Sequence, residues 1–288
     1  MIYTDFIMKR IAIITGASAG MGREAARELF LNSQKYKFGK IDELWVIARR
    51  IDRLSSLKFD LELEAEKNPE VEHPRLVPIE ANLSGRAGIS AVAALLKAEQ
   101  MTNEKSEGFE IALLMNNAGF GTYGEFSETP LEKELDMIDI NCISLTGITG
   151  VAIPYMNKGC TILNVASLAA FLPLGNFAVY AATKSYVLSF SVALAAELKD
   201  KGIHVTAMCP GSVSTEFANV ASNGARKEVK GGKSAVKTVK HALRSASKKK
   251  HIALWHPQWK VTAFFSRFVG RFIGARFTFL YNKRPYKK

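Results

Sequence analysis

The sequence predicts a doubly wound α/β domain, with a central parallel sheet of seven strands flanked by helices. Two observations predict this fold class. Short segments that are apolar nearly throughout recur along the chain, and strands buried on both faces of a parallel sheet have this composition. Longer amphipathic segments with helical periodicity separate them, and this alternation is typical of sheets covered by helices on both faces.

The apolar segments give the expected strands in chain order. They lie at residues 10–15, 43–48, 75–80, 111–116, 161–166 and 203–209, with a seventh at 251–255. The expected helices lie at residues 21–34, 52–67, 85–102, 131–152 and 178–200. The pattern is weakest between residues 212 and 250, where one helix is expected at 234–247. No linker-like segment interrupts the series, so residues 1–256 are assigned to one domain and residues 257–288 to a C-terminal extension.

Cysteine and histidine usage argues against two classes of site. The three cysteines, Cys142, Cys160 and Cys209, are far apart and odd in number, which argues against a disulfide framework and suits a reducing compartment. The five histidines are scattered, so no metal site is expected. The N-terminus lacks the apolar segment of a signal peptide, and we expect no membrane-spanning helix. The expected location is therefore cytoplasmic, with peripheral contact at the cytoplasmic face of the membrane as a second option.

A turn with three glycines, TGASAGMG at Thr15 to Gly22, lies between the first expected strand and the first expected helix. Glycine lets the backbone turn sharply and approach a ligand closely, and a helix N-terminus offers free N–H groups to a phosphate. In this position the turn predicts a Rossmann-like dinucleotide site, although a tight turn without a ligand is the alternative.

Two arginines follow the second expected strand. In dinucleotide-binding folds an acid at this place binds the ribose 2′-hydroxyl, whereas an arginine accommodates a 2′-phosphate. Here Arg49 and Arg50 follow Ala48, and guanidinium groups form strong charge-assisted contacts with phosphate. The sequence therefore predicts NADP(H) as the cofactor. The alternative is two solvated arginines at the end of a strand.

Tyr180 and Lys184, in the segment YAATK, are spaced to share one face of an expected helix. The spacing alone does not identify a catalytic pair, because Tyr36 and Lys40 share it in a segment expected to be a surface loop. The loop NNAG at 116–119 follows the fourth strand, where open α/β sheets bind ligands, although a simple turn would look the same.

Together, TGASAGMG, NNAG, the asparagine of DINCIS, the serine of NVAS, YAATK and PGSVST resemble the motifs of the short-chain dehydrogenase/reductase superfamily, classical type. The resemblance covers about residues 9–216. Ser167 lies 13 residues before Tyr180, as the family pattern requires, whereas Tyr36 has no such serine before it.

The resemblance implies a catalytic tetrad of Asn141, Ser167, Tyr180 and Lys184. It also implies a cofactor site. The residues implied around the pyrophosphate are Gly16, Ser18, Ala19, Gly20, Met21 and Gly22; those on the adenosine side are Asn82, Leu83, Asn117, Ala118 and Gly119; those beside the nicotinamide are Pro210, Gly211, Val213 and Thr215, with Tyr180 and Lys184. Asn82 departs from the aspartate common in the family, but its amide can still bond to the base.

The tetrad predicts hydride transfer between NADP(H) and a ketone or secondary alcohol. Tyr180 would act as general acid and base, and Lys184 would lower the pKa of Tyr180 by Coulomb attraction. Ser167 would bind the substrate oxygen, and Asn141 would hold a water that relays protons. The first alternative is a hydroxysteroid or other alcohol dehydrogenase working in the oxidative direction. The second is a non-catalytic NADP(H)-binding scaffold.

The expected substrate is apolar and lipid-like, of 3-oxoacyl or steroid type. Phe120, Phe171, Leu172, Phe177 and Phe217 are expected near the pocket mouth, although each could instead belong to the core. The resemblance also implies a homodimer or homotetramer that pairs through residues 131–152 and 178–200.

The C-terminal extension is basic and aromatic. Residues 226–288 hold eighteen Lys and Arg against one acid, Glu228, a net charge of +17, whereas residues 1–225 carry −5. An apolar face is expected on a helix ending near Gly274, formed by Val261, Phe264, Phe265, Phe268, Val269, Phe272 and Ile273. Three interpretations stay open: packing against the domain or an oligomer partner, an interfacial membrane helix, and nucleic-acid binding, for which no recognised motif is present and which we do not expect. Loosely similar extensions occur in relatives that act on long-chain 3-oxoacyl groups and steroids.

Overall fold

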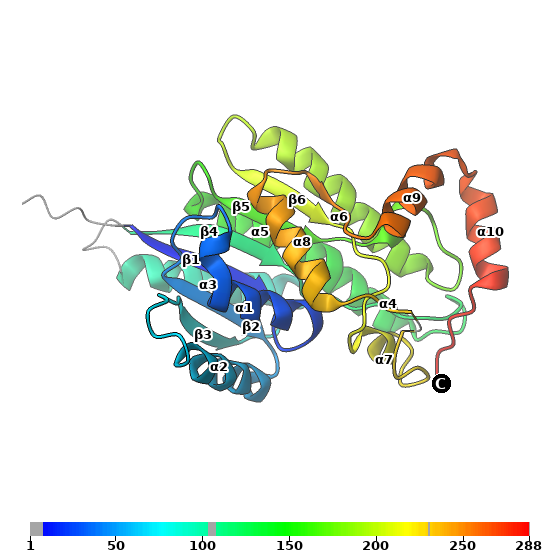
Figure 1. The fold of residues 1–288 in the computed structure, drawn as a ribbon. Helices are drawn as coiled ribbons and strands as arrows, with labels where there is room; N and C mark the ends of the chain where they lie inside the picture. Colours follow the sequence, from blue (N-terminus) through cyan, green and yellow to red (C-terminus); the bar gives the residue numbers. More distant parts are fainter. Residues whose placement is uncertain (1–7, 103–107, 230, 288) are drawn as a thin grey trace, which may run out of the picture.

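Seven parallel strands form one sheet in the computed structural model, which describes residues 8–102, 108–229 and 231–287 (Figure 1). The strands are β1 (Lys9–Thr15), β2 (Glu43–Ala48), β3 (Arg75–Glu80), β4 (Phe109–Asn116), β5 (Thr161–Val165), β6 (His204–Met208) and β7 (Ile252–Ala253). Their order is β3-β2-β1-β4-β5-β6-β7, so the direction of winding reverses between β1 and β4. Ligands of such sheets bind beyond the carboxyl ends of the strands at this reversal. Residues 1–7, which decide the signal-peptide expectation, lie outside the described residues.

Helices cover both faces of the sheet (Figure 1). One face carries α1 (Gly20–Asn32), α2 (Ile51–Ala65) and α8 (Ala235–Ser247), and the other carries α3 (Gly85–Thr102), α5 (Leu145–Ala152) and α6 (Ala178–Glu197). Alternate residues of β1 divide between the two cores: Ala12 and Ile14 join the first, and Ile11 and Ile13 join the second. Because both faces are covered, the strands are mostly apolar between their ends, and the predicted fold class is confirmed.

The expected helix at 131–152 is divided in the structure. It consists of α4 (Leu131–Ile138), a π-helical segment at Asp139–Ser144, and α5. Short π-helical segments within helices occur frequently at functional sites, and this one carries Asn141. In the weakly patterned region a short helix, α7 (Phe217–Ala221), precedes α8.

The C-terminal extension forms two helices, so the expected helix ending near Gly274 is wrong. Helix α9 (Pro257–Phe265) continues as a 3₁₀ turn to Phe268, and α10 (Arg271–Tyr281) follows. Val269 and Gly270 between them have extended backbone, with ψ of 124° and 129°. Gly274 therefore lies inside α10 rather than at a helix end. The expected apolar face of seven residues is exposed in the structure.

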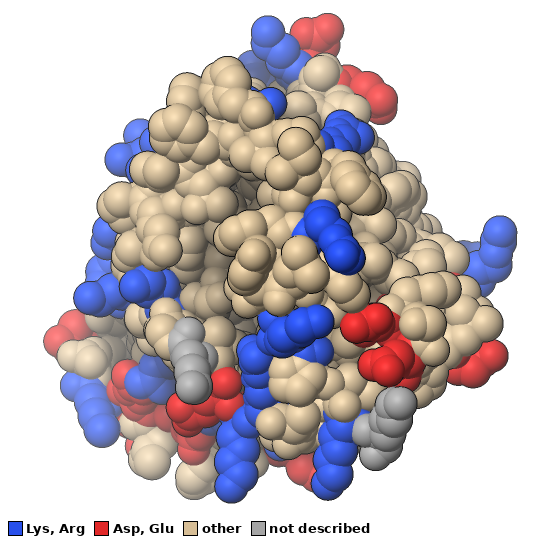
Figure 2. All heavy atoms as spheres, turned by 90° about the vertical axis from the view of Figure 1, so that its right-hand side faces the viewer, with Lys and Arg blue, Asp and Glu red and all other residues tan. Residues whose placement is uncertain are grey.

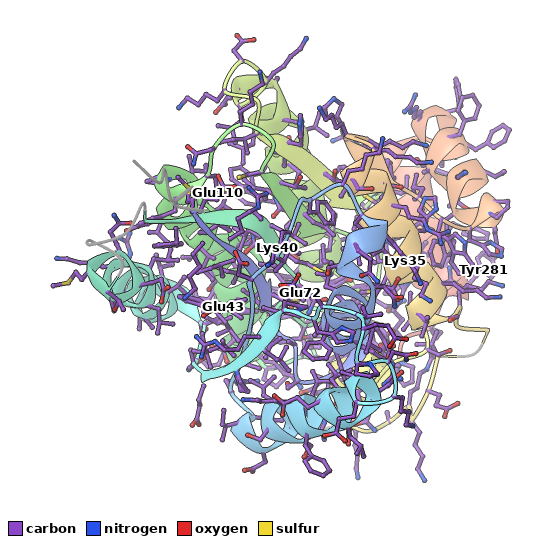
Figure 3. All side chains as sticks on the ribbon, turned by 60° about the vertical axis from the view of Figure 1, so that its left-hand side comes forward. Lys35, Lys40, Glu43, Glu72, Glu110 and Tyr281 are labelled. Carbon is purple, nitrogen blue, oxygen red and sulfur yellow. The ribbon has the colours of Figure 1, made fainter. Side chains whose placement is uncertain are left out.

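Buried acids at the amino ends of the strands are paired with cations. Glu43 binds Lys9 at 2.7 Å and also binds Arg75, and Glu110 binds Arg10. Figure 3 shows Glu43 and Glu110 on the opposite side of the molecule from Tyr281 of α10. These ion pairs are sufficient to explain why the acids are buried, and no ligand is needed there. The candidate site is therefore expected at the carboxyl ends of the strands.

Two helical stretches are long and apolar enough to cross a bilayer by length and composition, Leu131–Tyr155 and Ala178–Glu197. Both stretches pack against the sheet, where Ile148, Ala152 and Leu194 are buried in its core. This packing is sufficient to explain their apolar composition.

Candidate active site

A cleft of about 1860 Å³ opens where the strands end. It exceeds the roughly 300–1,000 Å³ of an ordinary ligand pocket, so it has room for a dinucleotide and a second molecule. The predicted cofactor residues that line it are Gly16, Ser18, Ala19, Gly20, Met21, Arg49, Arg50, Asn82, Leu83, Asn117, Ala118, Gly119, Tyr180, Lys184, Pro210, Gly211, Val213 and Thr215. The predicted substrate residues Ser167, Phe120, Phe171 and Phe217 line it as well. Gly22 and Asn141 are buried outside this lining.

The glycine turn packs so closely against the NNAG loop that side chains are excluded. Gly16 and Gly20 have left-handed φ angles of 67° and 54°. A Cβ atom on Gly22 would lie 2.4 Å from both Gly16 O and Asn117 Nδ2. The Asn117 amide donates to the carbonyls of Thr15 and Gly16, at 2.9 and 3.2 Å, and so ties the two loops together. The result is an open cradle at the N-terminus of α1, which fits a pyrophosphate.

Gly22→Ala is expected to lower the free energy of unfolding by about 1–3 kcal/mol, the usual cost of overpacking, and to weaken NADPH binding. The added methyl group would have a backbone oxygen at 2.4 Å. Gly150→Ala in α5 is the matched control, because a Cβ there meets nothing within 4 Å. Thermal unfolding and NADPH titration check the prediction, and equal results for both variants would contradict it.

Arg50 lies beside the cradle and has polar partners on two sides. Its Nε and Nη2 atoms both lie 3.2 Å from Ser18 Oγ, and its Nη1 atom lies 3.3 Å from Glu216. Arg53 Nη1 donates to the same carboxylate at 2.6 Å. Arg53 and Glu216 were not predicted from the sequence. The signal for Arg53 is its place on the first turn of α2, three residues after Arg50. Two neighbouring guanidinium groups fit a 2′-phosphate.

The adenosine side of the cleft is bordered by Asn82 and Leu83. Leu83 is buried, and Asn82 is exposed at the cleft. The Asn82 Oδ1 atom accepts a hydrogen bond from Ser84 N at 3.2 Å, at the start of α3. This bond fixes the loop, and an aspartate at the same place could accept it equally well.

The far end of the cleft is braced by the C-terminal extension. The Pro210 carbonyl accepts hydrogen bonds from Leu168 N at 2.8 Å and from Ser167 Oγ at 3.3 Å. Next to it, a Cβ atom on Gly211 would lie 2.3 Å from Nε1 of Trp259 in α9. The buried Trp259 therefore packs directly on the loop that borders the expected nicotinamide site.

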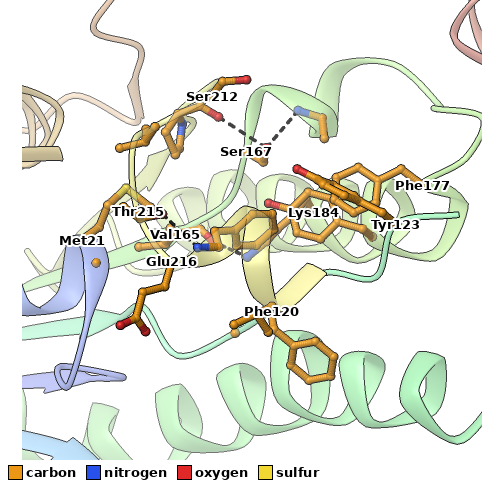
Figure 4. Close-up of a pocket in the computed structure, with 18 of the residues that line it drawn as sticks. Met21, Phe120, Tyr123, Val165, Ser167, Phe177, Lys184, Ser212, Thr215 and Glu216 are labelled. Atoms are coloured by element: carbon orange, nitrogen blue, oxygen red, sulfur yellow. Dashed lines mark hydrogen bonds between the residues drawn. The ribbon is translucent and has the colours of Figure 1, made fainter. Parts of the chain in front are cut away.

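The four predicted tetrad residues come from the turn after β5, from α6 and from the π-helical segment. Figure 4 shows two of them, Ser167 and Lys184, in the cleft. Lys184 Nζ donates to Val165 O at 2.8 Å and lies 5.7 Å from the centre of the Tyr180 ring. Asn141 Nδ2 donates to Phe120 O and to Thr183 Oγ1, both at 3.0 Å. The structure thus brings Ser167, Tyr180 and Lys184 to one cleft, while Asn141 fixes the loop beside them.

Burial raises the pKa of Tyr180 above its ordinary value. The hydrogen bond with Ser167 and the charge of Arg284 lower this pKa, and Tyr123 raises it. The Tyr180 ring is 7% exposed and stacks on Phe177 with 4.1 Å between centroids. The expected lowering of this pKa by Lys184 is therefore wrong, because the loss of hydration dominates.

Burial also lowers the pKa of Lys184, from 10.5 to about 8, while Cys142 and Cys209 raise it. At neutral pH the ammonium form therefore predominates, held by the Val165 carbonyl. A buried lysine with this pKa can change its protonation state near the operating pH of an enzyme.

The Lys184 pKa predicts how stability depends on pH. Between about pH 8 and 10.5 the unfolded chain holds a proton on Lys184 that the folded chain has released, so stability should rise with pH in this window. From about pH 8 to 10.5, the free energy of unfolding of the unmodified protein should increase by up to about 3 kcal/mol relative to that of the Lys184→Met variant. Urea unfolding of both proteins at several pH values measures the difference, and a constant difference would contradict a lowered Lys184 pKa.

Aromatic rings enclose the Tyr180 side of the cleft. Tyr123 and Phe217 pack around Phe177, and the Phe217 ring centre lies 5.4 Å from that of Tyr180. Arg284, at the end of the extension, donates to Gly175 O at 3.2 Å and lies 5.0 Å from the Phe177 ring centre. Sequence reasoning missed Tyr123 and Arg284, and no local pattern marks either of them.

A family model described as short chain dehydrogenase matches residues 10–226. The chain is 29% identical over 223 residues to a very-long-chain 3-oxoacyl-CoA reductase from Pyrenophora tritici-repentis, a match that covers 74% of this chain and 58% of that protein. It is 30% identical over 223 residues to a sulfoacetaldehyde reductase from Chromohalobacter salexigens, covering 75% and 78% of the two chains. A short-chain dehydrogenase from Sphingobium yanoikuyae, solved in complex with NADPH, shares the fold, with a TM-score of 0.70, 24% identity and 98% of each chain covered.

Proposed function

Because the chain belongs to the short-chain dehydrogenase family, we propose that it is an NADP(H)-dependent oxidoreductase that interconverts an apolar ketone and a secondary alcohol. One observation carries this proposal: a glycine cradle and the side chains of Ser167, Tyr180 and Lys184 line the same cleft. The family uses NAD(H) or NADP(H), and the paired guanidinium groups of Arg50 and Arg53 support the phosphorylated form.

The nicotinamide supplies or accepts the hydride, and the protein positions the substrate and handles the proton. The Ser167 hydroxyl lies close enough to the Tyr180 hydroxyl to lower its pKa, so both can bind one substrate oxygen. As negative charge develops on that oxygen, Tyr180 donates its proton to it. Lys184 would hold the ribose and take part in returning the proton to Tyr180. Asn141 would hold the water of that relay, next to the Phe120 carbonyl that it binds.

The raised pKa of Tyr180 suits the phenol to donate a proton to a ketone. A raised pKa keeps the phenol protonated at neutral pH, and a ketone that accepts hydride needs a proton donor. Oxidation of an alcohol would instead need the phenolate as base, which burial disfavours. An enzyme accelerates both directions of one reaction, so the ratio of oxidised to reduced cofactor sets the net direction, and the alcohol dehydrogenase stays the alternative.

The cleft wall supports an apolar substrate. Phe120, Phe171, Leu172, Phe177 and Phe217 all line it, as expected from the sequence. Burial of apolar surface is the main favourable contribution such rings make to binding. The reduction of a long-chain 3-oxoacyl group, as named for the Pyrenophora relative, agrees with this wall better than that of sulfoacetaldehyde.

A ketone panel tests the proposal. The purified protein should oxidise NADPH in the presence of long-chain 3-oxoacyl thioesters or steroid ketones, and more slowly with sulfoacetaldehyde. Loss of NADPH absorbance measures the rate, and product chromatography identifies the alcohol. Tight NADPH binding with no turnover of any ketone would favour the scaffold function instead.

We also propose assembly through helices α4 to α6, because apolar side chains on them are exposed. They include Leu135, Ile143, Tyr186 and Val192, between 40% and 47% exposed. Pairing of these helices between copies would cover them and give the homodimer or homotetramer expected of the family. The proposed location is cytoplasmic, with peripheral contact at the cytoplasmic face of the membrane.

A further inference from the structure

The outer side of helices α9 and α10 exposes large apolar side chains. Phe268, Phe272 and Ile273 are 73%, 80% and 69% exposed. We call this set the aromatic surface: Val261, Phe264, Phe265, Phe268, Val269, Phe272, Ile273, Phe277, Leu280 and Tyr281. Within it, the Phe264 ring contacts those of Phe265 and Phe268, and the Phe277 ring contacts that of Tyr281. Large exposed apolar side chains grouped in this way mark a contact site.

The two helices are attached to the domain by their opposite side, so the aromatic surface is held outward. Trp259 and Ala263 of α9 are buried, as are Gly274 and Thr278 of α10. A Cβ atom on Gly274 would lie 2.7 Å from Leu172, and Thr278 Oγ1 accepts a hydrogen bond from Gly175 N at 2.9 Å. The inner side of the two helices is therefore already packed on the domain, through Trp259 and through small or polar residues, and the exposed rings take no part in that packing.

Positive charge surrounds the aromatic surface. Residues 257–288 contain eight Lys and Arg and no acid. Lys260, Arg267, Arg271 and Arg276 are exposed, and the salt bridges among the described residues involve none of the cations in 257–287. Figure 2 shows this face with many uncharged side chains around a hollow, Lys and Arg both near its middle and at its margin, and groups of Asp and Glu in its lower part. These charges stay available for an anionic partner.

The mouth of the cleft opens beside the same surface. Thr262 and Ser266 at the end of α9, and Phe277 and Tyr281 of α10, line the cleft. Phe277 and Tyr281 belong to the aromatic surface as well, at 57% and 72% exposed. A partner that covers this surface would therefore lie at the cleft mouth.

We propose that the aromatic surface docks on an anionic phospholipid bilayer. Bulky apolar rings beside Lys and Arg suit the boundary between acyl chains and anionic headgroups. A second copy of the chain is a poorer occupant, because a two-fold contact would place like charges against each other. If the proposed function holds, an apolar ketone can pass from the bilayer directly into the cleft.

Vesicle flotation of the full-length protein tests the docking. It should float with phosphatidylcholine vesicles containing phosphatidylserine, and much less with phosphatidylcholine alone or at high salt. Phe268→Ser/Phe272→Ser/Ile273→Ser should lower the vesicle partition coefficient about 100-fold or more, since three inserted side chains are lost. Arg267→Gln/Arg271→Gln should lower it about 30-fold on the anionic vesicles.

The matched control is Phe59→Ser/Leu63→Ser/Met101→Ser, which removes side chains that are 68%, 51% and 61% exposed on α2 and α3. It should float like the unmodified protein. Absence of flotation by the unmodified protein, or equal loss in the control, would overturn the proposal. A triple variant that floats normally but has a smaller oligomeric mass would overturn it in favour of a second copy. NADPH titration and circular dichroism check folding separately, so failure of the proposed enzyme function would not affect the outcome.

Discussion

Tyr180→Phe is expected to lower kcat by about 10³-fold, the size of effect that follows removal of a positioned general acid. The affinity for NADPH should not change, because the phenylalanine ring keeps its stacking partner Phe177 at 4.1 Å between centroids. The Tyr180 phenol donates the proton, and together with Ser167 it forms hydrogen bonds to the developing oxyanion. The variant has no hydroxyl at this position, so it cannot donate the proton at all. Single-turnover kinetics with saturating NADPH isolate the chemical step from binding.

Tyr186→Phe is the control for this prediction. Tyr186 lies on the same helix, 43% exposed, and its hydroxyl bonds to Thr146 Oγ1 at 2.7 Å outside the cleft. Its loss should leave kcat unchanged. A Tyr180→Phe variant with the turnover of the unmodified protein would exclude Tyr180 as the proton donor.

The sequence predicted those elements and site residues whose positions depend on a few neighbouring residues and on their burial. Strands such as β4 are buried at every position, so composition alone located them. The glycine turn and the segment YAATK carry their geometry within a few residues, so their places at the cleft were predictable. Tyr36 shows the limit of such patterns: it is buried and donates to Glu28 at 2.6 Å, although its segment was expected to be a surface loop.

The features that sequence reasoning missed depend on contacts between distant segments. Glu216 meets Arg50 across 166 positions of the chain, and Arg284 meets Gly175 across 109. The direction of the Tyr180 pKa shift was also missed, since it depends on how many rings surround the phenol and not on the lysine one turn away. The break before Gly270 divides the extension at a place where the apolar spacing gives no signal.

Arg50→Ser/Arg53→Ser is expected to lower kcat/KM for NADPH about 100-fold while changing the value for NADH little. Each guanidinium would form a charge-assisted hydrogen bond with the 2′-phosphate, and such bonds contribute about 1.5–3 kcal/mol. Both side chains are about 45% exposed, so each hydrogen bond is expected to contribute an energy at the lower end of that range. Two contacts of that size correspond to roughly a 100-fold change in kcat/KM for NADPH. Steady-state kinetics with each cofactor at one ketone concentration give the ratio directly.

Two further variants decide whether the effect is specific. Arg23→Ser removes a comparably exposed arginine, paired with Asp60 at 3.2 Å, and should leave the NADPH to NADH ratio unchanged. Glu216→Gln should move the ratio the other way, because the carboxylate that holds Arg50 and Arg53 competes with a phosphate for the same guanidinium groups. Its pKa is lowered, chiefly by the hydrogen bond from Arg53, so it is ionised throughout the neutral range and always repels the phosphate. If Glu216→Gln weakened NADPH binding instead, the carboxylate would be orienting the arginines rather than competing for them, and the basis for NADP(H) preference would lie elsewhere in the cleft.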